Sequence, residues 1–155
     1  MPRDIKNFKP STKSRFKQGE FDKYNPLKYF GSRPIIYRSS WELKFMRICE
    51  FNPEVEKWTS ENIMVPYTMR EFINGKFVIK RHNYYPDFVV HLKNGDKILV
   101  EVKPLSQSPM NENQMKLDPV QYKNARKWKA ALEWCKQNGY KFRVITEQHL
   151  KTKIF

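Results

Sequence analysis

Two apolar runs near the middle of the chain alternate with polar positions as β-strands do. The first covers residues 84–92 and the second residues 97–103, and both are rich in Val, Leu and other strand-forming residues. The segment between them, Lys93-Asn94-Gly95-Asp96, is typical of the turn of a β-hairpin. The pattern therefore predicts two antiparallel strands here.

The length of this turn decides which polar side chains meet. A two-residue loop would place Asp87 opposite Val102, and the carboxylates of Asp87 and Glu101 would then point to opposite faces of the sheet. A three-residue loop, with Gly95 left-handed in a G1 bulge, shifts the register by one residue. Asp87 then faces Glu101, and Lys103 lies on the same face one step along. We predict the bulged turn.

Two other segments have the apolar period of an amphipathic helix. Residues 39–51 place apolar side chains at i, i+4, i+7 and i+8, counted from Trp41. Residues 118–138 begin with Asp118-Pro119, an N-cap followed by proline, and end at Asn138-Gly139. We expect the second helix to be buried along one stripe, consisting of Ala125, Trp128, Leu132 and Cys135.

The remaining segments complete an α/β domain. Residues 63–81 form a second hairpin around Asn74-Gly75, with Phe72 and Phe77 as cross-strand neighbours. We expect a last strand at residues 140–145 and a short helical tail at residues 146–155. Residues 52–62 and 104–117 are expected to be irregular connections. The element order predicts a central mixed sheet, antiparallel through the hairpins, whose last strand follows the long helix.

The charge of the chain indicates its partner. The 155 residues carry a net charge of +14, with a pI near 9.8, which favours a polyanion. Residues 1–34 contain nine Lys or Arg with aromatic residues between them, and we treat them as an arm preceding a domain of residues 35–155. The arm either binds phosphates and bases or packs over the domain, and the sequence leaves both open.

Several other classes of protein are disfavoured by composition. No apolar run approaches the ~20 residues of a membrane span, and the N-terminus lacks the apolar core of a signal peptide. The two cysteines and three histidines have no zinc-ligand spacing. We therefore expect no membrane contact, no zinc and no small-molecule cofactor, and an intracellular protein with reduced cysteines.

Facing carboxylates need a compensating cation, because like charges placed opposite each other on a sheet are destabilising. Oxygen ligands suit Mg²⁺ or Mn²⁺, with water completing the coordination. A lysine beside such an ion, here Lys103, orients a water or stabilises charge on a phosphate, which is the chemistry of phosphodiester hydrolysis. The alternative is a Lys–Glu surface ladder, since Glu-x-Lys alone is a weak signal that also occurs at residues 42–44.

At these residues the chain resembles the PD-(D/E)XK nuclease superfamily: Pro86-Asp87 is followed by Glu101-Val102-Lys103 across a hairpin. Within the superfamily, residues 37–43 and 139–147 are similar to TnsA-type transposon-end endonucleases. Size, basicity and the run as a whole are similar to the head-completion nucleases of T-even-type tailed phages. The resemblance implies a restriction-endonuclease-like αβββαβ core with a mixed sheet flanked by helices.

The resemblance also implies roles for individual residues. Asp87, Glu101 and the backbone carbonyl of Val102 would hold the metal, Lys103 would act beside it, and Glu42 would complete the acidic cluster. Glu42 has a second interpretation, because Ser39 and Glu42 fit a helix capping box without any chemistry. The cationic residues expected to contact DNA are Lys13, Arg15, Lys17, Arg33, Arg38, Lys80 and Arg81.

The resulting hypothesis is a metal-dependent DNA nuclease, an endonuclease or exonuclease, that trims packaged DNA before the phage head joins its tail. Its partners would be DNA and head, portal or neck proteins, in the cytoplasm of the infected bacterium or in the virion. Two alternatives remain: a non-catalytic DNA-binding component of a phage particle, and an RNA-processing nuclease.

Overall fold

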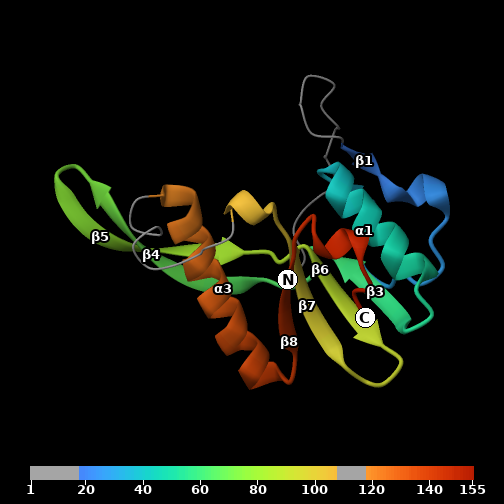
Figure 1. Ribbon diagram of the computed structural model, residues 1–155. Coiled ribbons are helices and arrows are strands. Elements are labelled where there is room, and N and C mark those ends of the chain that lie inside the picture. The colour runs from blue at the N-terminus through green and yellow to red at the C-terminus, as the bar shows by residue number, and fades with distance from the viewer. Residues whose placement is uncertain (1–17, 108–117) are drawn as a thin grey trace.

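The computed structural model describes residues 18–107 and 118–155, and a mixed four-stranded sheet forms their centre (Figure 1). Its strand order is β3-β6-β7-β8. β3, β6 and β7 are antiparallel, whereas β8 lies parallel to β7. The predicted mixed α/β sheet is thus confirmed. The strand bounds are Val55–Ser60 (β3), Phe88–Leu92 (β6), Lys97–Val102 (β7) and Lys141–Ile145 (β8).

Two helices cover opposite faces of this sheet, α1 (Ser40–Phe51) and α3 (Pro119–Asn138) (Figure 1). Because strand side chains alternate between faces, Phe88 and Val100 belong to the core cluster that includes α1, whereas Val89 and Leu99 belong to the cluster that includes α3. Both caps are as predicted: Ser39 Oγ accepts the Glu42 N–H, and Asp118 Oδ1 accepts from the first turn of α3.

The buried side of α3 differs from the predicted stripe. Ala131 and Cys135 are buried, but Leu132 is exposed, and Gln121 and Asn124 take the buried positions near the N-terminus. Their amides donate to backbone carbonyls of a short 3₁₀ helix, η2 (Leu105–Gln107), in the predicted loop. Residues 108–117 of that loop lie outside the described residues. An amphipathic pattern could not reveal this side, because part of its packing is polar.

The expectation for residues 52–62 is also wrong: they contain β3, which pairs with β6 along the edge of the sheet. The pairing has an irregularity between Val55 and Lys57. Val55 and Trp58 are therefore both buried although they are three residues apart. This bulge breaks the period of two by which a strand is recognised, and the charged residues around it gave the appearance of a connection.

The hairpin of β6 and β7 has the predicted bulged turn. Phe88 pairs with Val100, and the Leu92 N–H donates to the Asp96 carbonyl, which leaves a three-residue loop. Gly95 has a φ of +96°, in the left-handed region that favours glycine. The register continues to Asp87 and Glu101, which lie opposite each other just before β6 and near the end of β7.

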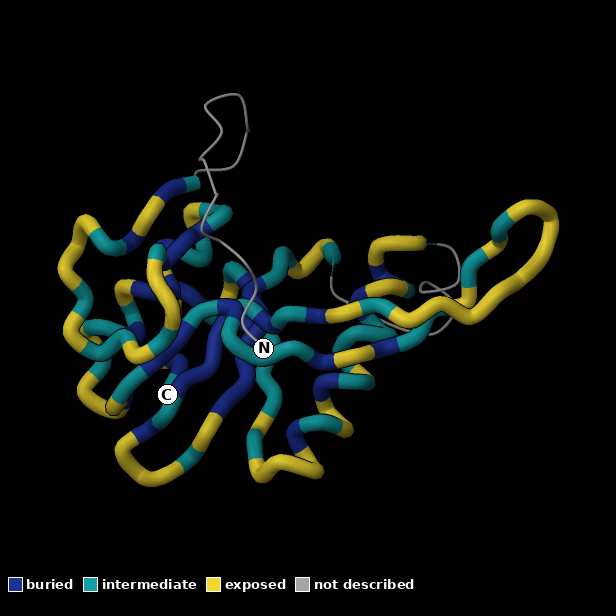
Figure 2. The backbone as a smooth tube through the Cα atoms, turned by 180° about the vertical axis from the view of Figure 1, so that it is seen from behind, coloured by how far each residue is buried: buried dark blue, intermediate teal, exposed yellow. Residues whose placement is uncertain are grey.

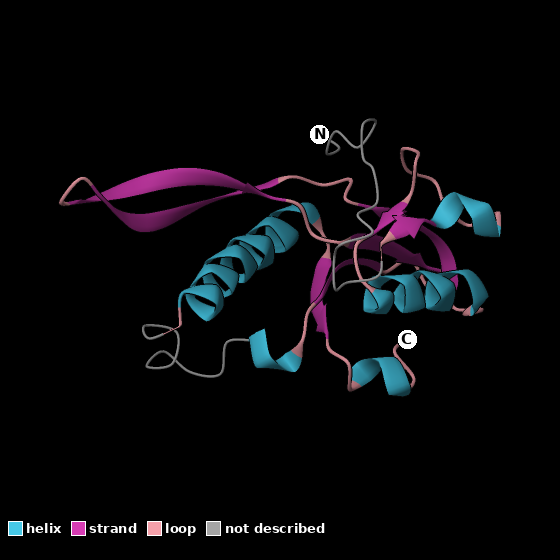
Figure 3. Ribbon diagram, turned by 90° about the horizontal axis from the view of Figure 1, so that it is seen from above, coloured by secondary structure: helices cyan, strands magenta, loops and turns pink. Residues whose placement is uncertain are grey.

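The other hairpin forms a separate ribbon that extends away from the body of the protein (Figure 3). It consists of β4 (Val65–Ile73) and β5 (Lys76–Tyr84). Phe72 pairs with Phe77 as predicted, with ring centroids 5.0 Å apart. The base of the ribbon packs on α3 through Val65, Tyr67 and Tyr84. Along the chain, the ribbon is thus inserted between β3 and β6, the first two strands of the four-stranded sheet.

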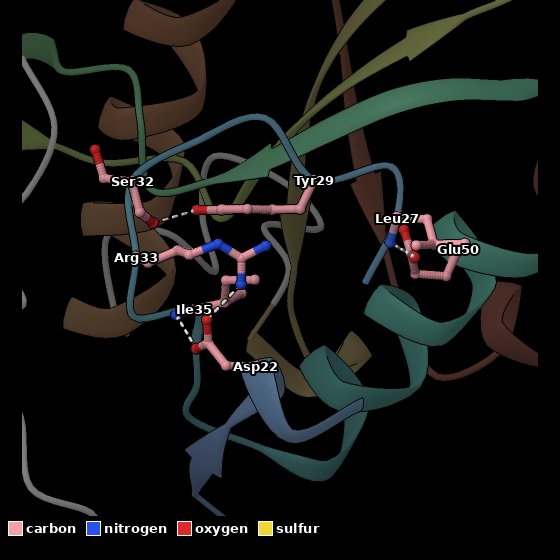
Figure 4. A network of polar contacts seen from close by, with 7 residues as sticks. All are labelled: Asp22, Leu27, Tyr29, Ser32, Arg33, Ile35 and Glu50. Carbon is pink, nitrogen blue, oxygen red and sulfur yellow. Dashed lines mark hydrogen bonds and ion pairs between the residues drawn. The ribbon is translucent and has the colours of Figure 1, made fainter. Parts of the chain in front are cut away.

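Residues 18–34 lie against the domain. β1 (Gly19–Glu20) pairs with β2 (Ile36–Tyr37), and η1 (Phe21–Tyr24) carries Phe21 into the main core cluster. Figure 4 shows the polar contacts that hold this segment: Asp22 accepts from Arg33 and the Ile35 N–H, and Glu50 of α1 accepts from the Leu27 N–H at 2.6 Å. The packed interpretation therefore applies to this part of the arm, and residues 1–17 lie outside the described residues.

The packing of Phe21 leads to a prediction about folding. We expect Phe21→Ala to lower the free energy of unfolding by about 3–5 kcal/mol, the usual cost of removing a buried phenyl ring. Urea denaturation measures this change. Phe30→Ala is the matched control, because Phe30 lies in the same segment but is partly exposed, and it should cost much less. Equal effects of the two substitutions would contradict the packed arrangement.

The chain ends in a short tail after β8, as predicted. It contains η3 (His149–Lys151), and Leu150 and Ile154 join the core cluster beneath α1. The Arg143 guanidinium donates to the Ile154 carbonyl and holds the tail against the sheet. None of the helices within residues 18–107 and 118–155 has the length and apolar character needed to cross a membrane.

Candidate active site

Asp87, Glu101 and Lys103 come together where β6 begins and β7 ends. The Asp87 carboxylate accepts the Val102 N–H at 2.8 Å, so the strand itself fixes one of its oxygens. Lys103 Nζ lies 3.7 Å from Glu101 Oε1. The Tyr84 hydroxyl donates to the other Glu101 oxygen at 2.7 Å. The three side chains predicted from the hairpin register thus share one face of the sheet.

These residues line a pocket of about 300 Å³. It lies where the first turn of α1, the end of β5, the end of β7 and the middle of α3 meet. Its lining contains four carboxyl groups and three basic groups, so the fully ionised pocket has an excess of negative charge. The lining residues are Arg38, Glu42, Glu61, Asn83, Tyr84, Tyr85, Asp87, Glu101, Val102, Lys103 and Lys127.

Glu42 reaches this pocket from the first turn of α1, and it also takes part in the predicted helix cap. Its backbone N–H donates to Ser39 Oγ, and the Ser39 hydroxyl lies 3.1 Å from Glu42 Oε2, as in a capped helix start. The same carboxyl lines the pocket with Asp87 and Glu101, and the three groups repel one another electrostatically. The cap therefore orients Glu42 toward the acidic cluster.

The pKa values of all three carboxyl groups are raised. Burial is the main cause at Asp87, whose pKa lies well above its usual range, and the charges of Glu101 and Glu42 add to it. Burial also raises the pKa of Glu101, although Lys103 and the Tyr84 hydroxyl oppose it. Burial raises the pKa of Glu42 to about 7, and the nearby charges of Glu61 and Glu101 add to this effect. The hydrogen bond with Ser39 acts in the opposite direction. The folded protein therefore holds these carboxylates in a state that favours a proton or another cation.

The fourth carboxyl group is neutralised within the protein. Arg38 binds Glu61 through two nitrogens, with Nε 3.1 Å from Oε1 and Nη2 3.4 Å from Oε2. Arg38 was expected to contact DNA, and here it forms part of the pocket wall. Because this pair cancels, the remaining charge comes from three carboxyl groups facing the amines of Lys103 and Lys127.

Lys127 and Tyr84 are site residues that sequence reasoning missed. Lys127 Nζ lies 5.3 Å from the centroid of the Tyr84 ring, and its pKa is lowered, mainly by burial. Lys127 lies outside the stripe of Ala125, Trp128, Leu132 and Cys135 that the sequence predicts to be buried. A signal existed, since Lys127 precedes the buried Ala131 and Cys135 at intervals of four residues and so shares their side of the helix.

Three other predicted DNA-binding residues lie within the described part of the chain, and none of these three lines the pocket. Arg33 pairs with Asp22 at 2.5 Å in the packed N-terminal segment. Lys80 and Arg81 are exposed on β5 of the ribbon. Lys13, Arg15 and Lys17 belong to the part of the chain that the structure does not describe. The pocket and the ribbon are therefore the two regions in which predicted functional residues gather.

The donor groups at the pocket fit a hard divalent cation. Among residues 18–107 and 118–155, no three side chains of His, Cys, Asp or Glu form a complete metal-ligand cluster. Mg²⁺ needs no such cluster, because it commonly keeps several waters and binds one or two carboxylates. Asp87, Glu101 and the Val102 carbonyl would supply oxygen ligands, with Glu42 beside them. A buried carboxylate, Glu101, and a half-buried one, Asp87, both with raised pKa values, are the observation that a divalent ion would explain.

Comparisons with known proteins agree with this geometry. Residues 52–147 match the family model described as TnsA-like endonuclease N terminal. The chain is also 30% identical over 149 residues to the head completion nuclease of Enterobacteria phage T4, covering 88% of this chain and 95% of that protein. The match to the family model includes Asp87, Glu101 and Lys103, whereas Glu42 lies upstream of it. The resemblance drawn from the sequence is confirmed, and the chain belongs to the TnsA-like endonuclease family of nucleases.

Proposed function

We propose that this protein is a divalent-metal-dependent DNA nuclease that hydrolyses phosphodiester bonds at the pocket between β6, β7 and α3. The observation that carries the proposal is the meeting of Asp87 and Glu101 across the hairpin, with Lys103 Nζ 3.7 Å from Glu101. A structural role gives no reason to place two like charges opposite each other, with Glu101 buried and Asp87 half-buried, since their repulsion destabilises the fold.

Mg²⁺ or Mn²⁺, when bound, supplies Lewis-acid activation of water and neutralises phosphate charge. Asp87, Glu101 and the Val102 carbonyl would hold the ion, and Glu42 would complete the acidic side of the site. Tyr84 positions Glu101 through its hydroxyl hydrogen bond. The Val102 N–H in turn orients Asp87, so both proposed ligands are fixed by rigid strands rather than by loops.

Two lysines act on the substrate side of the site. Lys103 would orient the attacking hydroxide or stabilise the pentacovalent phosphorane, because its ammonium lies beside the Glu101 carboxylate. Lys127 approaches the same carboxylate from α3 and would add positive charge where negative charge develops. Burial lowers the pKa of Lys127, and the same burial strengthens the electrostatic field of its ammonium group.

A relative that matches nearly the whole chain supports a proposal for the biological role. The protein from phage T4 is named a head completion nuclease, and the match covers 88% of this chain and 95% of the T4 protein. We infer a corresponding role here: trimming packaged DNA during head completion, before head and tail join. Partners would then include head, portal or neck proteins, and the protein would act in the cytoplasm of the infected bacterium or within the virion.

The test of this function is cleavage of supercoiled plasmid with Mg²⁺, with Mn²⁺, and with EDTA. We expect nicked or linear products with either ion and none with EDTA. Competition with RNA of equal length distinguishes an RNA-processing nuclease, which would prefer the RNA. Binding of DNA without any ion-dependent cleavage would support the non-catalytic alternative and contradict our proposal.

The missed lysine provides a separate prediction. We expect Lys127→Met to slow Mg²⁺-dependent plasmid cleavage by about 10- to 100-fold, because one positive charge near the reacting phosphate is lost. Lys129→Met is the matched control, since Lys129 is exposed on the same helix. Single-turnover cleavage rates would measure both. If the two variants were equally active, Lys127 would be excluded from the site.

A further inference from the structure

The ribbon of β4 and β5 has one face whose side chains are exposed toward its far end, whereas at the base of that face the Thr68 hydroxyl accepts a hydrogen bond from Arg126 of α3. Its inner face holds Tyr67 and Tyr84, which pack on α3. The pairing of Phe72 with Phe77 and of Arg70 with Ile79 puts these side chains together on the opposite face. Phe72 and Phe77 are each 64% exposed and Ile79 is 76% exposed. Figure 2 shows the far end of the ribbon as exposed chain, extending away from the buried strands.

Cations accompany these apolar side chains. Arg70 stacks over the Phe77 ring at 4.2 Å, and Arg81 lies on the same face opposite Thr68. The ribbon also carries Lys76 and Lys80, which the same register places on the inner face. Its single carboxylate, Glu71, belongs to the inner face and pairs with His82 at 3.0 Å. The outer face therefore combines positive charge with exposed aromatic rings and has no acidic residue.

This face leads directly into the pocket. Asn83 follows Arg81 by two residues, so it shares the outer face, and it also lines the pocket with Asp87. Tyr84, the last residue of β5, contacts Glu101 on the other side. Asn83 thus places the pocket end of the outer face beside the carboxylates of the pocket.

We propose that the outer face of the β4–β5 ribbon grips duplex DNA in a groove and places the cleaved phosphate at the pocket. This inference rests on the proposed function, and it adds the substrate class and the element that holds it. A two-stranded ribbon fits the major groove of B-DNA, which is about 12 Å wide. Arg70 and Arg81 would contact the flanking phosphates. Phe72 and Phe77, at the tip of the ribbon, would pack on or between bases.

The dimensions of the ribbon agree with this role. At about 3.3 Å per residue, the distance from Asn83 to Phe77 is about 20 Å. B-DNA advances about 34 Å per turn, so the tip would contact the duplex about half a turn from the cleaved bond. Duplex DNA is favoured over a protein partner because the face is cationic, lacks carboxylates and continues into a pocket suited to phosphate chemistry.

Binding of a duplex of about 30 base pairs, roughly three helical turns, would test the ribbon. Affinity is measured by fluorescence anisotropy in EDTA, so that cleavage plays no part. We expect Phe72→Ser combined with Phe77→Ser to weaken binding at least about ten-fold, the loss typical of removing an aromatic contact with a base. Both rings are exposed, so the double variant should fold. Phe51→Ser is the matched control, since Phe51 is 84% exposed at the end of α1, and it should bind as the wild type does.

Salt dependence gives an independent measurement on the same face. Arg81→Gln should lower the slope of log affinity against log salt by about 0.9, the value for one lost phosphate contact. Lys129→Gln, on the exposed side of α3, should leave the slope unchanged. A wild-type slope in Arg81→Gln would contradict the proposed phosphate contact.

The outcomes separate this proposal from the proposed function. Suppose that wild type cleaves DNA and that the Phe72→Ser/Phe77→Ser double variant, the tip variant, binds and cleaves DNA as wild type does. The ribbon then does not grip DNA, although the nuclease function stands. If wild type cleaves no DNA but the tip variant still loses duplex affinity, the ribbon proposal stands and the catalytic proposal fails. Preserved DNA affinity together with loss of binding to a phage head or neck protein would reassign the ribbon to that protein and overturn our inference.

Discussion

Glu101→Gln is expected to reduce metal-dependent DNA cleavage by about 1000-fold or more while leaving duplex affinity nearly unchanged. The amide is almost the same size as the carboxyl, and its oxygen can still accept the Tyr84 hydroxyl hydrogen bond. What it lacks is the negative charge that would hold a divalent ion next to Asp87. Loss of that ion removes both its activation of water and its neutralisation of the phosphate.

The matched control for this substitution is Glu56→Gln. Glu56 lies on β3 of the same sheet but is exposed, so its replacement should not affect cleavage. Asp87→Asn and Lys103→Met should each cause a loss similar to that of Glu101→Gln, since the three residues act at one site. Single-turnover cleavage of a labelled duplex, together with anisotropy in EDTA, separates chemistry from binding. Cleavage at the wild-type rate by Glu101→Gln would refute catalysis at this pocket.

The site was predictable where it depends on local rules. The register that joins Asp87 to Glu101 is fixed by a three-residue turn, and Gly95 supplies the left-handed conformation that this turn requires. Ser39 and Asp118 mark the starts of both helices through their caps, which are also local signals. A single stretch of sequence therefore contained the central geometry of the site.

The contributions from distant elements could not be predicted in the same way. Lys127 belongs to the site because α3 packs over the face that contains Glu101, and no local pattern specifies that packing. β3 was missed because its bulge disrupts the alternation of buried and exposed residues. The polar packing of Gln121 and Asn124 is likewise invisible to hydrophobic periodicity. In each case the tertiary arrangement, rather than local preference, decides which side of the element is buried.

The acidic cluster should also make the metal-free protein less stable as pH rises. Glu42 has an ordinary pKa of 4.5 and a pKa of about 7 in the folded protein. A group whose pKa is raised by folding contributes stability below its unfolded pKa and loses that contribution as pH rises through its folded pKa. The loss should therefore occur between about pH 4.5 and pH 7. Asp87 and Glu101 have raised pKa values and act in the same direction.

The size of this effect can be bounded. The full shift at Glu42, from 4.5 to about 7, corresponds to about 3.5 kcal/mol, at about 1.4 kcal/mol per pKa unit. Because Glu42 is only half-buried and faces an open pocket, water screens part of that energy, and we expect a drop of about 1–2 kcal/mol from this residue. Lys103 lies beside Glu101 and opposes the upward shift of its pKa without abolishing it.

Urea denaturation of the metal-free protein at about pH 5 and about pH 8 would measure this drop. Glu42→Gln carries no ionisable group at this position, so it should be more stable than wild type at the higher pH and show a smaller decrease between the two. Glu133→Gln, at an exposed position on α3, should follow wild type. Saturating Mg²⁺ at the higher pH should restore stability to wild type, because an ion that binds only the folded state stabilises it, and should do so less for Glu101→Gln. Parallel pH curves for wild type and Glu42→Gln would show that the acidic cluster does not affect the Glu42 carboxyl. An equal response of wild type and Glu101→Gln to Mg²⁺ would remove Glu101 from the proposed ligands.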